Sequence, residues 1–266
     1  MKNYYTKRIL LLISLVFVLL VTLRKILPIL FEKNYEDNIF LYQGIIKLIL
    51  LFITIYIIQK DKLINWDFIY KNTFLSLIAS SLLIFFSLQH TFTKINELKI
   101  SVSDFTHYCY IFQCLATGFF EEFFFRILIF SYVCNALQSN LKTNNYKPIL
   151  ITSFLFSIVH LTSLFNDDID KVSVLNQMMF AFVIGVILQS IFFRWNTIFL
   201  NSIIHAVLNY NGMIKSKLFM IEDNSVDVSA FENFIQSFIT FVILLLIIAL
   251  PLTYVSVRNR KNYLIK

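Results

Sequence analysis

The sequence predicts an all-α integral membrane protein, in which about eight transmembrane helices form a bundle around a polar site near the bilayer midplane. The 266-residue chain is 58% hydrophobic and only 15% charged, whereas soluble domains are about a quarter charged. Long apolar runs recur along it, and an α-helix needs about 20 apolar residues to cross a bilayer. The basic residues behind the net charge of +7 flank these runs and form no single patch. This pattern favours contact with membrane lipid and argues against a nucleic-acid partner.

Polar residues bound each of the eight predicted spans. The first span follows a basic N-terminus and lacks a small-residue cleavage site, so we interpret it as an uncleaved span. Residues 105–137 would form a helix about 50 Å long, more than a hydrocarbon core of about 30 Å. We therefore expect an interfacial first part, or a bend near Gly118. The spans are 9–23, 40–58, 73–89, one within 105–137, 149–165, 172–193, 197–213 and 234–257.

Eight spans place both termini on the same side of the membrane. Lys and Arg are more numerous in the segments on that side, which predicts cytoplasmic N- and C-termini. Lys47 lies near the start of the second span, where we expect its ammonium group to reach the membrane interface.

Charged residues interrupt the apolar segment at Glu121, Glu122 and Arg126. An ionised group at the centre of a bilayer costs about 2.5–3.5 kcal/mol, so these residues imply a buried ion pair or chemistry. Glu122 and Arg126 are four residues apart, which is the favourable spacing for an ion pair on one helix face. Glu121 projects about 100° away from Glu122, so we expect it to have different neighbours.

Histidines occur in two later spans. His160 follows Phe156 by one helical turn, so the phenyl ring is expected to pack on the imidazole. His205 and Asn209 likewise share one helix face. With a rise of 1.5 Å per residue, Glu121, His160 and His205 lie between roughly 13 and 24 Å from the predicted cytoplasmic helix ends. The three groups can therefore meet in one layer.

Two imidazoles and a carboxylate are typical zinc ligands, so Glu121, His160 and His205 are candidate metal ligands. Bound zinc lowers the pKa of its water, and a neighbouring Glu can accept the proton. Structural interpretations stay open, because a Glu–Arg pair can clamp helices together and a single His can hydrogen-bond between them. A transporter with a midplane ion site is a further alternative, although the sequence has no internal repeat. We expect His90 and His107, at predicted interfaces, to be structural.

Three motifs together resemble those of the CPBP family of intramembrane proteases, which is also called Abi and is named for CAAX proteases and bacteriocin processing. The order and separations of the motifs fit this family, within residues 118–210. They are Glu121-Glu122-x-x-x-Arg126, Phe156-x-x-x-His160 and His205-x-x-x-Asn209.

The resemblance implies a glutamate-dependent intramembrane metalloprotease. Glu121 is then the catalytic carboxylate that activates water, while Glu122 and Arg126 set its position and local charge. His160, His205 and Asn209 line the site and bind zinc, or orient water and the substrate carbonyl. For Asn209 we favour stabilisation of the oxyanion, since amides are poor zinc ligands. Whether zinc or a metal-free Glu–His pair does the chemistry stays open at this point.

The resemblance also implies an organisation and a class of substrate. Residues 1–104 would hold three N-terminal helices, 105–213 the catalytic core, and 214–266 a loop and the last helix. The Ile-, Asn-, Lys- and Phe-rich composition is typical of an AT-rich bacterial genome, so the expected substrate is a peptide or membrane protein, such as a peptide pheromone or bacteriocin precursor. The alternative is a non-enzymatic bacteriocin self-immunity or membrane scaffold protein.

Overall fold

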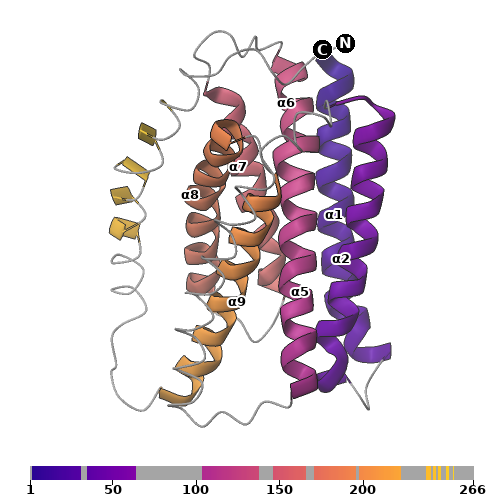
Figure 1. Ribbon diagram of the computed structural model, residues 1–266, viewed down its shortest axis with the longest axis vertical. Coiled ribbons are helices and arrows are strands. Elements are labelled where there is room, and N and C mark those ends of the chain that lie inside the picture. The colour runs from indigo at the N-terminus through magenta and orange to yellow at the C-terminus, as the bar shows by residue number, and fades with distance from the viewer. Residues whose placement is uncertain are drawn as a thin grey trace. The chain divides into compact units, whose positions relative to one another are not determined.

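The computed structural model describes residues 2–30, 35–63, 104–137, 146–165, 171–195, 198–222 and scattered positions between 238 and 254 (Figure 1). All secondary-structure elements among these residues are helical and none is a strand, which confirms the all-α prediction. Four helices are long and apolar enough to cross a membrane, so the chain is a multi-pass membrane protein. They cover Asn3–Leu23, Ile39–Lys60, Lys147–Phe165 and Lys171–Phe192.

These four helices coincide with the first, second, fifth and sixth predicted spans. A shorter apolar helix, Ile198–Tyr210, lies in the predicted seventh span. The predicted third span, 73–89, lies outside the described residues, as does most of the eighth. The total of eight spans therefore stays a prediction.

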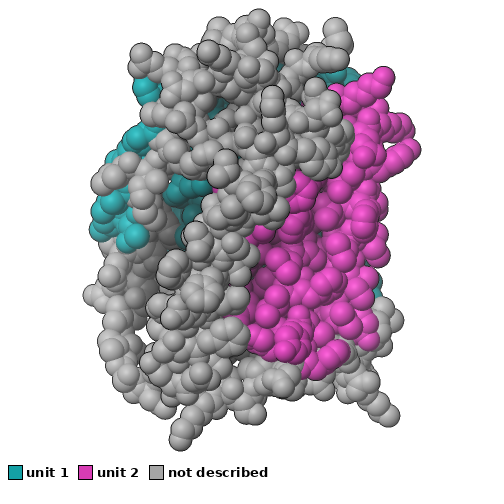
Figure 2. Space-filling view, viewed as in Figure 1, with its two compact units in different colours: residues 1–32, 125–195, 228–266 teal, residues 33–124, 196–227 magenta. Residues whose placement is uncertain are grey.

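The chain divides into two compact units (Figure 2). The first unit contains Met1–Glu32, Phe125–Trp195 and Val228–Lys266, and the second contains Lys33–Phe124 and Asn196–Asp227. Helices α1 (Lys2–Leu30), α6 (Phe130–Leu137), α7 (Lys147–Val159), η2 (His160–Phe165) and α8 (Lys171–Trp195) belong to the first unit. Helices α2 (Tyr35–Lys60), α5 (Asp104–Glu122) and α9 (Ile198–Glu222) belong to the second. The sequence-based division into three segments stays a prediction.

In the first unit, α7 and α8 pack side by side in opposite directions. Gly185 of α8 faces Ser153, and Gln177, earlier in α8, lies near Ser163 at the end of η2. Helix α7 begins with Pro148 in its first turn, where a missing N–H leaves no helical hydrogen bond unmade. The buried core joins α6, α7 and α8 through Phe130, Cys134, Ile149, Val183 and Val186.

In the second unit, α5 packs against both α2 and α9. Phe40 of α2 contacts Tyr110, and Lys47, two turns later, contacts Glu121, so α2 and α5 run in the same direction. Helix α9 runs the other way, because Tyr210 near its middle stacks on Tyr110 while Phe199 at its start contacts Phe119 near the end of α5. This arrangement brings residues from all three helices to the C-terminal end of α5.

The helix that begins with α5 continues through η1 (Phe123–Ile129) into α6. Helix α5 is uninterrupted at Gly118, so the departure from α-helical geometry comes after this residue and not at it. It comes in η1, which is a π-helix. The i→i+5 hydrogen bonds of a π-helix widen the turn, and such segments are frequent at functional sites. The 3.6-residue period used for Glu122 and Arg126 therefore does not hold across this segment.

Candidate active site

Glu121 and Glu122 are the last two residues of α5, immediately before the π-helix. Their exposure differs, since the Glu121 side chain retains 16% of its surface and Glu122 is fully buried. Both carboxylates lie in a strongly aromatic setting. Phe120 and Phe124 flank them in the sequence, and their rings pack against each other with centroids 5.5 Å apart. Only Glu121 is therefore open to a reactant.

His205 of α9 lies between the two carboxylates. Its Nδ1 donates a hydrogen bond to Glu122 Oε1 at 2.9 Å, and its Nε2 lies 3.5 Å from Glu121 Oε2. The first distance is that of a charge-assisted hydrogen bond, and the second is too long for a strong one. In neutral imidazole, an Nδ1–H leaves a lone pair on Nε2. That lone pair and the Glu121 oxygen can both accept a proton or bind a cation placed between them.

Gly118 permits the close approach of α9 that puts His205 in this position. A Cβ atom at Gly118 would lie 2.4 Å from the carbonyl oxygen of Ser202 and 2.9 Å from the backbone nitrogen of Ala206. Contacts of this length do not occur, so any side chain here would push the helices apart. The role of Gly118 is therefore helix packing one turn before the two carboxylates.

Asn201 is a site residue that the sequence analysis did not select. It is fully buried, and its Nδ2 donates a hydrogen bond to Glu122 Oε2 at 3.3 Å. Both oxygens of Glu122 thus accept hydrogen bonds, Oε2 from Asn201 and Oε1 from His205. The signal was present in the sequence, because Asn201, His205 and Asn209 recur every four residues and share one face of α9.

Lys47 of α2 is the second residue that the sequence analysis missed. Its Nζ donates to Glu121 Oε1 at 3.0 Å and lies 5.0 Å from the centroid of the Phe120 ring. Its side chain retains only 13% of its surface. The expectation that Lys47 reaches the membrane interface is therefore wrong, because an ion pair with a carboxylate at the end of α5 compensates its charge inside the protein.

Asn209 lies one turn after His205 on α9, as predicted, and is half-buried. Its backbone carbonyl accepts a hydrogen bond of 2.9 Å from the hydroxyl of Tyr110, which also donates to the carbonyl of Tyr210. Tyr210 in turn contacts His107 Nε2 through its hydroxyl, at 3.2 Å. His107 therefore has a packing partner, as the structural interpretation of this residue requires. The oxyanion-stabilising role of Asn209 stays a prediction.

The remaining two predicted site residues, Arg126 and His160, belong to the first unit. His160 directly follows α7 as the first residue of η2, and its Nδ1 lies 3.2 Å from the carbonyl oxygen of Phe156. The Phe156 ring packs edge-on against the imidazole, with centroids 5.0 Å apart, as the spacing predicts. The guanidinium of Arg126 stacks over the same ring at 4.8 Å. Phe156 therefore connects the arginine of the first motif with the histidine of the second.

The predicted residues thus fall into two groups. Glu121 and Glu122 both contact His205 in the second unit, whereas Arg126 and His160 share an aromatic neighbour in the first. The predicted ion pair of Glu122 with Arg126 and the convergence of His160 on Glu121 stay predictions. The expectation that Glu121 and Glu122 have different neighbours is wrong for His205, which contacts both.

The donor atoms near His205 are of the type that zinc binds. Two ligands of a tetrahedral zinc ion lie about 3.3 Å apart, close to the 3.5 Å between His205 Nε2 and Glu121 Oε2. An imidazole that donates its other N–H to a carboxylate is also usual for a metal ligand. In the part of the chain that the structure describes, no group of three or more His, Cys, Asp or Glu side chains could hold a metal ion. A catalytic zinc needs a third protein ligand, and the predicted one, His160, belongs to the other unit and stays a prediction.

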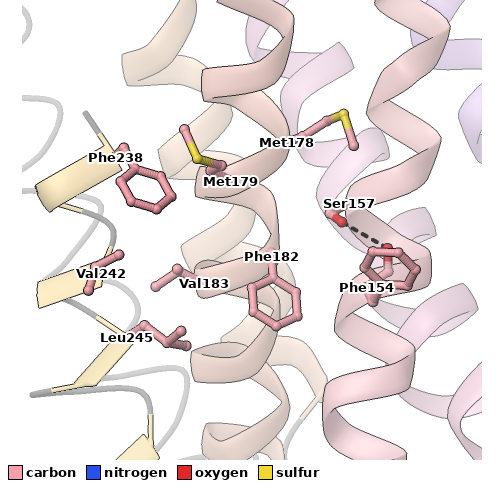
Figure 3. Close-up of a pocket in the computed structure, with 9 residues that line it drawn as sticks. All are labelled: Phe154, Ser157, Met178, Met179, Phe182, Val183, Phe238, Val242 and Leu245. Carbon is pink, nitrogen blue, oxygen red and sulfur yellow. Dashed lines mark hydrogen bonds between the residues drawn. The ribbon is translucent and has the colours of Figure 1, made fainter. Parts of the chain in front are cut away.

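An apolar pocket of about 310 Å³ lies in the first unit, between α7, α8 and residues 238–245 (Figure 3). Met178, Met179 and Phe182 of α8 contribute much of its lining. Its one hydroxyl, that of Ser157, donates to the carbonyl of Phe154 at 2.8 Å. Such a lining offers no group for acid–base chemistry, so this pocket is not the candidate active site.

Comparison with known protein families gives one result that bears on this site. Residues 103–211 match the model of the family described as Type II CAAX prenyl endopeptidase Rce1-like. The match begins just before α5, includes all six predicted site residues and ends after Asn209. Comparison with curated proteins and with solved structures gives no match. The chain therefore contains, at residues 103–211, a type II CAAX prenyl endopeptidase Rce1-like domain of the CPBP family.

Proposed function

We propose that this chain is an intramembrane endopeptidase that hydrolyses a peptide bond in a peptide or membrane-protein substrate near the cytoplasmic face. The Rce1-like domain supports the reaction class. The observation on which the assignment chiefly rests is the position of His205, which contacts both Glu121 and Glu122 among apolar helices. Two carboxylates and an imidazole in contact are costly in such surroundings, and chemistry is a sufficient reason to keep them.

In this proposal, Glu121 is the general base. The Glu121 side chain is partly exposed, which lets a water molecule reach the carboxylate, and its Oε2 lies next to His205 Nε2. The water oxygen attacks the substrate carbonyl carbon, and the water proton passes to Glu121. Glu121 then delivers this proton to the leaving nitrogen as the C–N bond breaks, which yields a carboxylic acid and an amine. General acid–base catalysis of this kind typically contributes about 100- to 10,000-fold.

The other residues position the reactants. Glu122 holds the His205 ring so that Nε2 faces Glu121. The side-chain amide of Asn209 donates to the developing oxyanion, a contribution that only the transition state receives in full. The sequence motifs are the ground on which His160 and Arg126 are included among the proposed site residues. If zinc were bound, His205, Glu121 and His160 would be its ligands, and it would supply a more acidic water and a polarised carbonyl in place of proton acceptance by Glu121 Oε2.

The substrate class follows from the family and the composition. The family description names prenylated CAAX substrates, whereas the residue composition favours a bacterial peptide pheromone or bacteriocin precursor. Both have a peptide segment that must reach a site between membrane helices. We propose the peptide precursor as the physiological substrate.

Cleavage of a defined probe by the purified full-length protein tests this function. The probes are internally quenched peptides, one ending in a prenylated CAAX sequence and one spanning the leader junction of a bacteriocin precursor. We expect Glu121→Gln to lower kcat by about 100-fold or more, because the amide cannot accept the proton. Asp61→Asn, which alters a carboxylate in the turn after α2, is the matched control and should keep wild-type activity.

The non-enzymatic alternative makes a different prediction with the same variants. An immunity or scaffold protein would protect cells from a bacteriocin even with Glu121→Gln, provided that the fold survives. Normal cleavage by folded Glu121→Gln protein, or no cleavage of any probe by the wild type together with full protection by the variant, would exclude the proposed peptidase.

A further inference from the structure

Lys47 lies outside the Rce1-like domain, yet it contacts the residue proposed as the catalytic base. Its Nζ is 3.0 Å from Glu121 Oε1. The other carboxylate oxygen, Oε2, faces His205 Nε2 at 3.5 Å. The two oxygens of Glu121 therefore have different neighbours: Oε1 pairs with the Lys47 ammonium group, and Oε2 faces the His205 imidazole.

Helix α2 is held in register so that Lys47 reaches this oxygen. One turn earlier, a Cβ atom at Gly44 would lie 2.6 Å from the Phe112 ring, so α2 and α5 are in close contact there. The side-chain amide of Gln113 donates a hydrogen bond to Gln43 beside this contact. Lys47 follows Gly44 by three residues and Gln43 by four, so its side chain lies on the side of α2 that packs against α5. The packing of Gln43 and Gly44 against α5 thus places the Lys47 ammonium group at the candidate site.

We propose that Lys47 is a positioning residue for Glu121: it fixes Oε1 so that Oε2 points to the reactant side, next to His205. This inference rests on the proposed peptidase function. It extends the active site beyond residues 103–211, to a helix that the family match does not include. The Rce1-like domain therefore depends on α2 for a group that orients its base.

Two physical effects support this role. First, Glu121 and Glu122 are adjacent anions, and both contact one imidazole, so a nearby positive charge offsets their repulsion. Second, the pair is mostly shielded from solvent, with 13% and 16% of the two side-chain surfaces exposed, so salt screens it less than a surface pair. Phe120 adds a contact to the ammonium group at 5.0 Å, which restricts the lysine further.

Without Lys47, Oε1 of Glu121 loses its ion pair, and the carboxylate is less restrained in the oxygen that it presents to His205. A misplacement of a reacting group by about 1 Å can lower a rate by about 100-fold. Because Lys47 contacts the base and not the substrate in this arrangement, its loss should lower kcat and leave KM nearly unchanged.

The first experiment compares kcat and KM of four full-length proteins with the quenched peptide probe that the wild type cleaves. We expect Lys47→Met to lower kcat at least about tenfold, with KM changed less than about twofold, and Lys47→Arg to keep kcat within about threefold of wild type. Lys60→Met is the matched control, because Lys60 is an exposed lysine of the same helix that lies over Tyr56. Unchanged kcat in Lys47→Met, or equally low kcat in Lys47→Arg, would overturn the proposal. If Lys47→Met does not fold, Lys47→Gln replaces it with the same expectations.

The second experiment needs no substrate and separates this proposal from the peptidase assignment. Thermal unfolding of the detergent-solubilised protein is measured for Lys47→Met, Glu121→Gln and the double variant. Coupling predicts that the double variant loses clearly less Tm than the sum of the single losses. Additive losses would show that the two side chains do not interact, and would overturn the role of Lys47. A wild type without any cleavage but with strong coupling would instead remove only the peptidase function and leave the contact.

Discussion

His205 Nδ1 donates a 2.9 Å hydrogen bond to Glu122 Oε1, and Glu122 is fully buried at the end of α5. This bond fixes the imidazole ring and leaves Nε2 directed at Glu121. The buried Glu122 therefore orients the ring of His205. The two adjacent glutamates thus contact different nitrogens of the same ring.

Glu122→Gln tests this orienting role. The glutamine oxygen can still accept from Nδ1, but its amide then faces the Asn201 amide, and the negative charge is gone. Loss of such a supporting carboxylate typically costs about 10- to 100-fold. We expect kcat of Glu122→Gln to fall by this amount and kcat of Glu122→Ala to fall further. Both purified variants should remain monodisperse, which shows that they still fold. Wild-type kcat in folded Glu122→Gln protein would contradict the role.

Two substitutions of Asn201 test its hydrogen bond to the other oxygen of Glu122, Oε2, and should lower the stability to different extents. Asn201→Ala removes one hydrogen bond to a charged group, worth about 1.5–3 kcal/mol, and should lower the free energy of unfolding by that amount. Asn201→Asp should be worse than Asn201→Ala, because a second buried carboxylate would repel Glu122. Denaturation followed by circular dichroism measures the difference.

Ser190→Ala is the control for this series. Ser190 is buried in α8 and donates to the carbonyl of Val186 in its own helix, so its loss removes a hydrogen bond other than those that Glu122 accepts from Asn201 and His205. Equal stability of the Asn201→Ala and Asn201→Asp proteins would show that Asn201 does not sense the charge of Glu122.

Some of this structure could be predicted from sequence and some could not, for physical reasons. Membrane helices are predictable because length and apolar composition alone decide whether a segment can cross a bilayer. The grouping of Glu121 with His205 followed from comparable depth along two helices. The contact of Lys47 with Glu121 could not be predicted, because the distance of a lysine from the end of a span does not identify the residue that compensates its charge. Asn201 was overlooked, although it lies on the face of α9 that carries His205.

The π-helix at Phe123–Ile129 could not be predicted from the sequence, for a different reason. Its backbone hydrogen bonds depend on how the surrounding helices pack, and a run of aromatic residues gives no sign of them. The relation between Glu122 and Arg126 was derived from the α-helical period, which the wider turn of this segment changes. Sequence spacing was therefore reliable within each regular helix and unreliable across the segment between the motif's glutamates and its arginine.

Gly118→Ala tests whether the approach of α9 is needed. The added methyl group would lie 2.4 Å from the Ser202 carbonyl oxygen, so α9 must shift away. Overpacking of this kind costs about 1–3 kcal/mol, and His205 moves with Ser202 because both lie on α9. We expect a lower Tm and a loss of kcat larger than the stability change explains. Gly185→Ala is the control, since its nearest contact is the Ser153 side chain at 3.0 Å and it lies in the first unit.

Metal content tests whether the pair of His205 and Glu121 belongs to a zinc site. Their 3.5 Å separation fits two zinc ligands, and a catalytic site takes three protein ligands. We expect about one zinc per chain in protein purified without chelators, measured by mass spectrometry of the metal. His205→Ala and His160→Ala should both lose it. His107→Ala should keep it, because His107 contacts the Tyr210 hydroxyl and not the carboxylates. Retention in His160→Ala with loss in His205→Ala would show that the third ligand is another residue. Fully active protein without zinc would instead leave Glu121 and His205 as the whole of the proton-transfer chemistry, with Lys47 as the cation beside them.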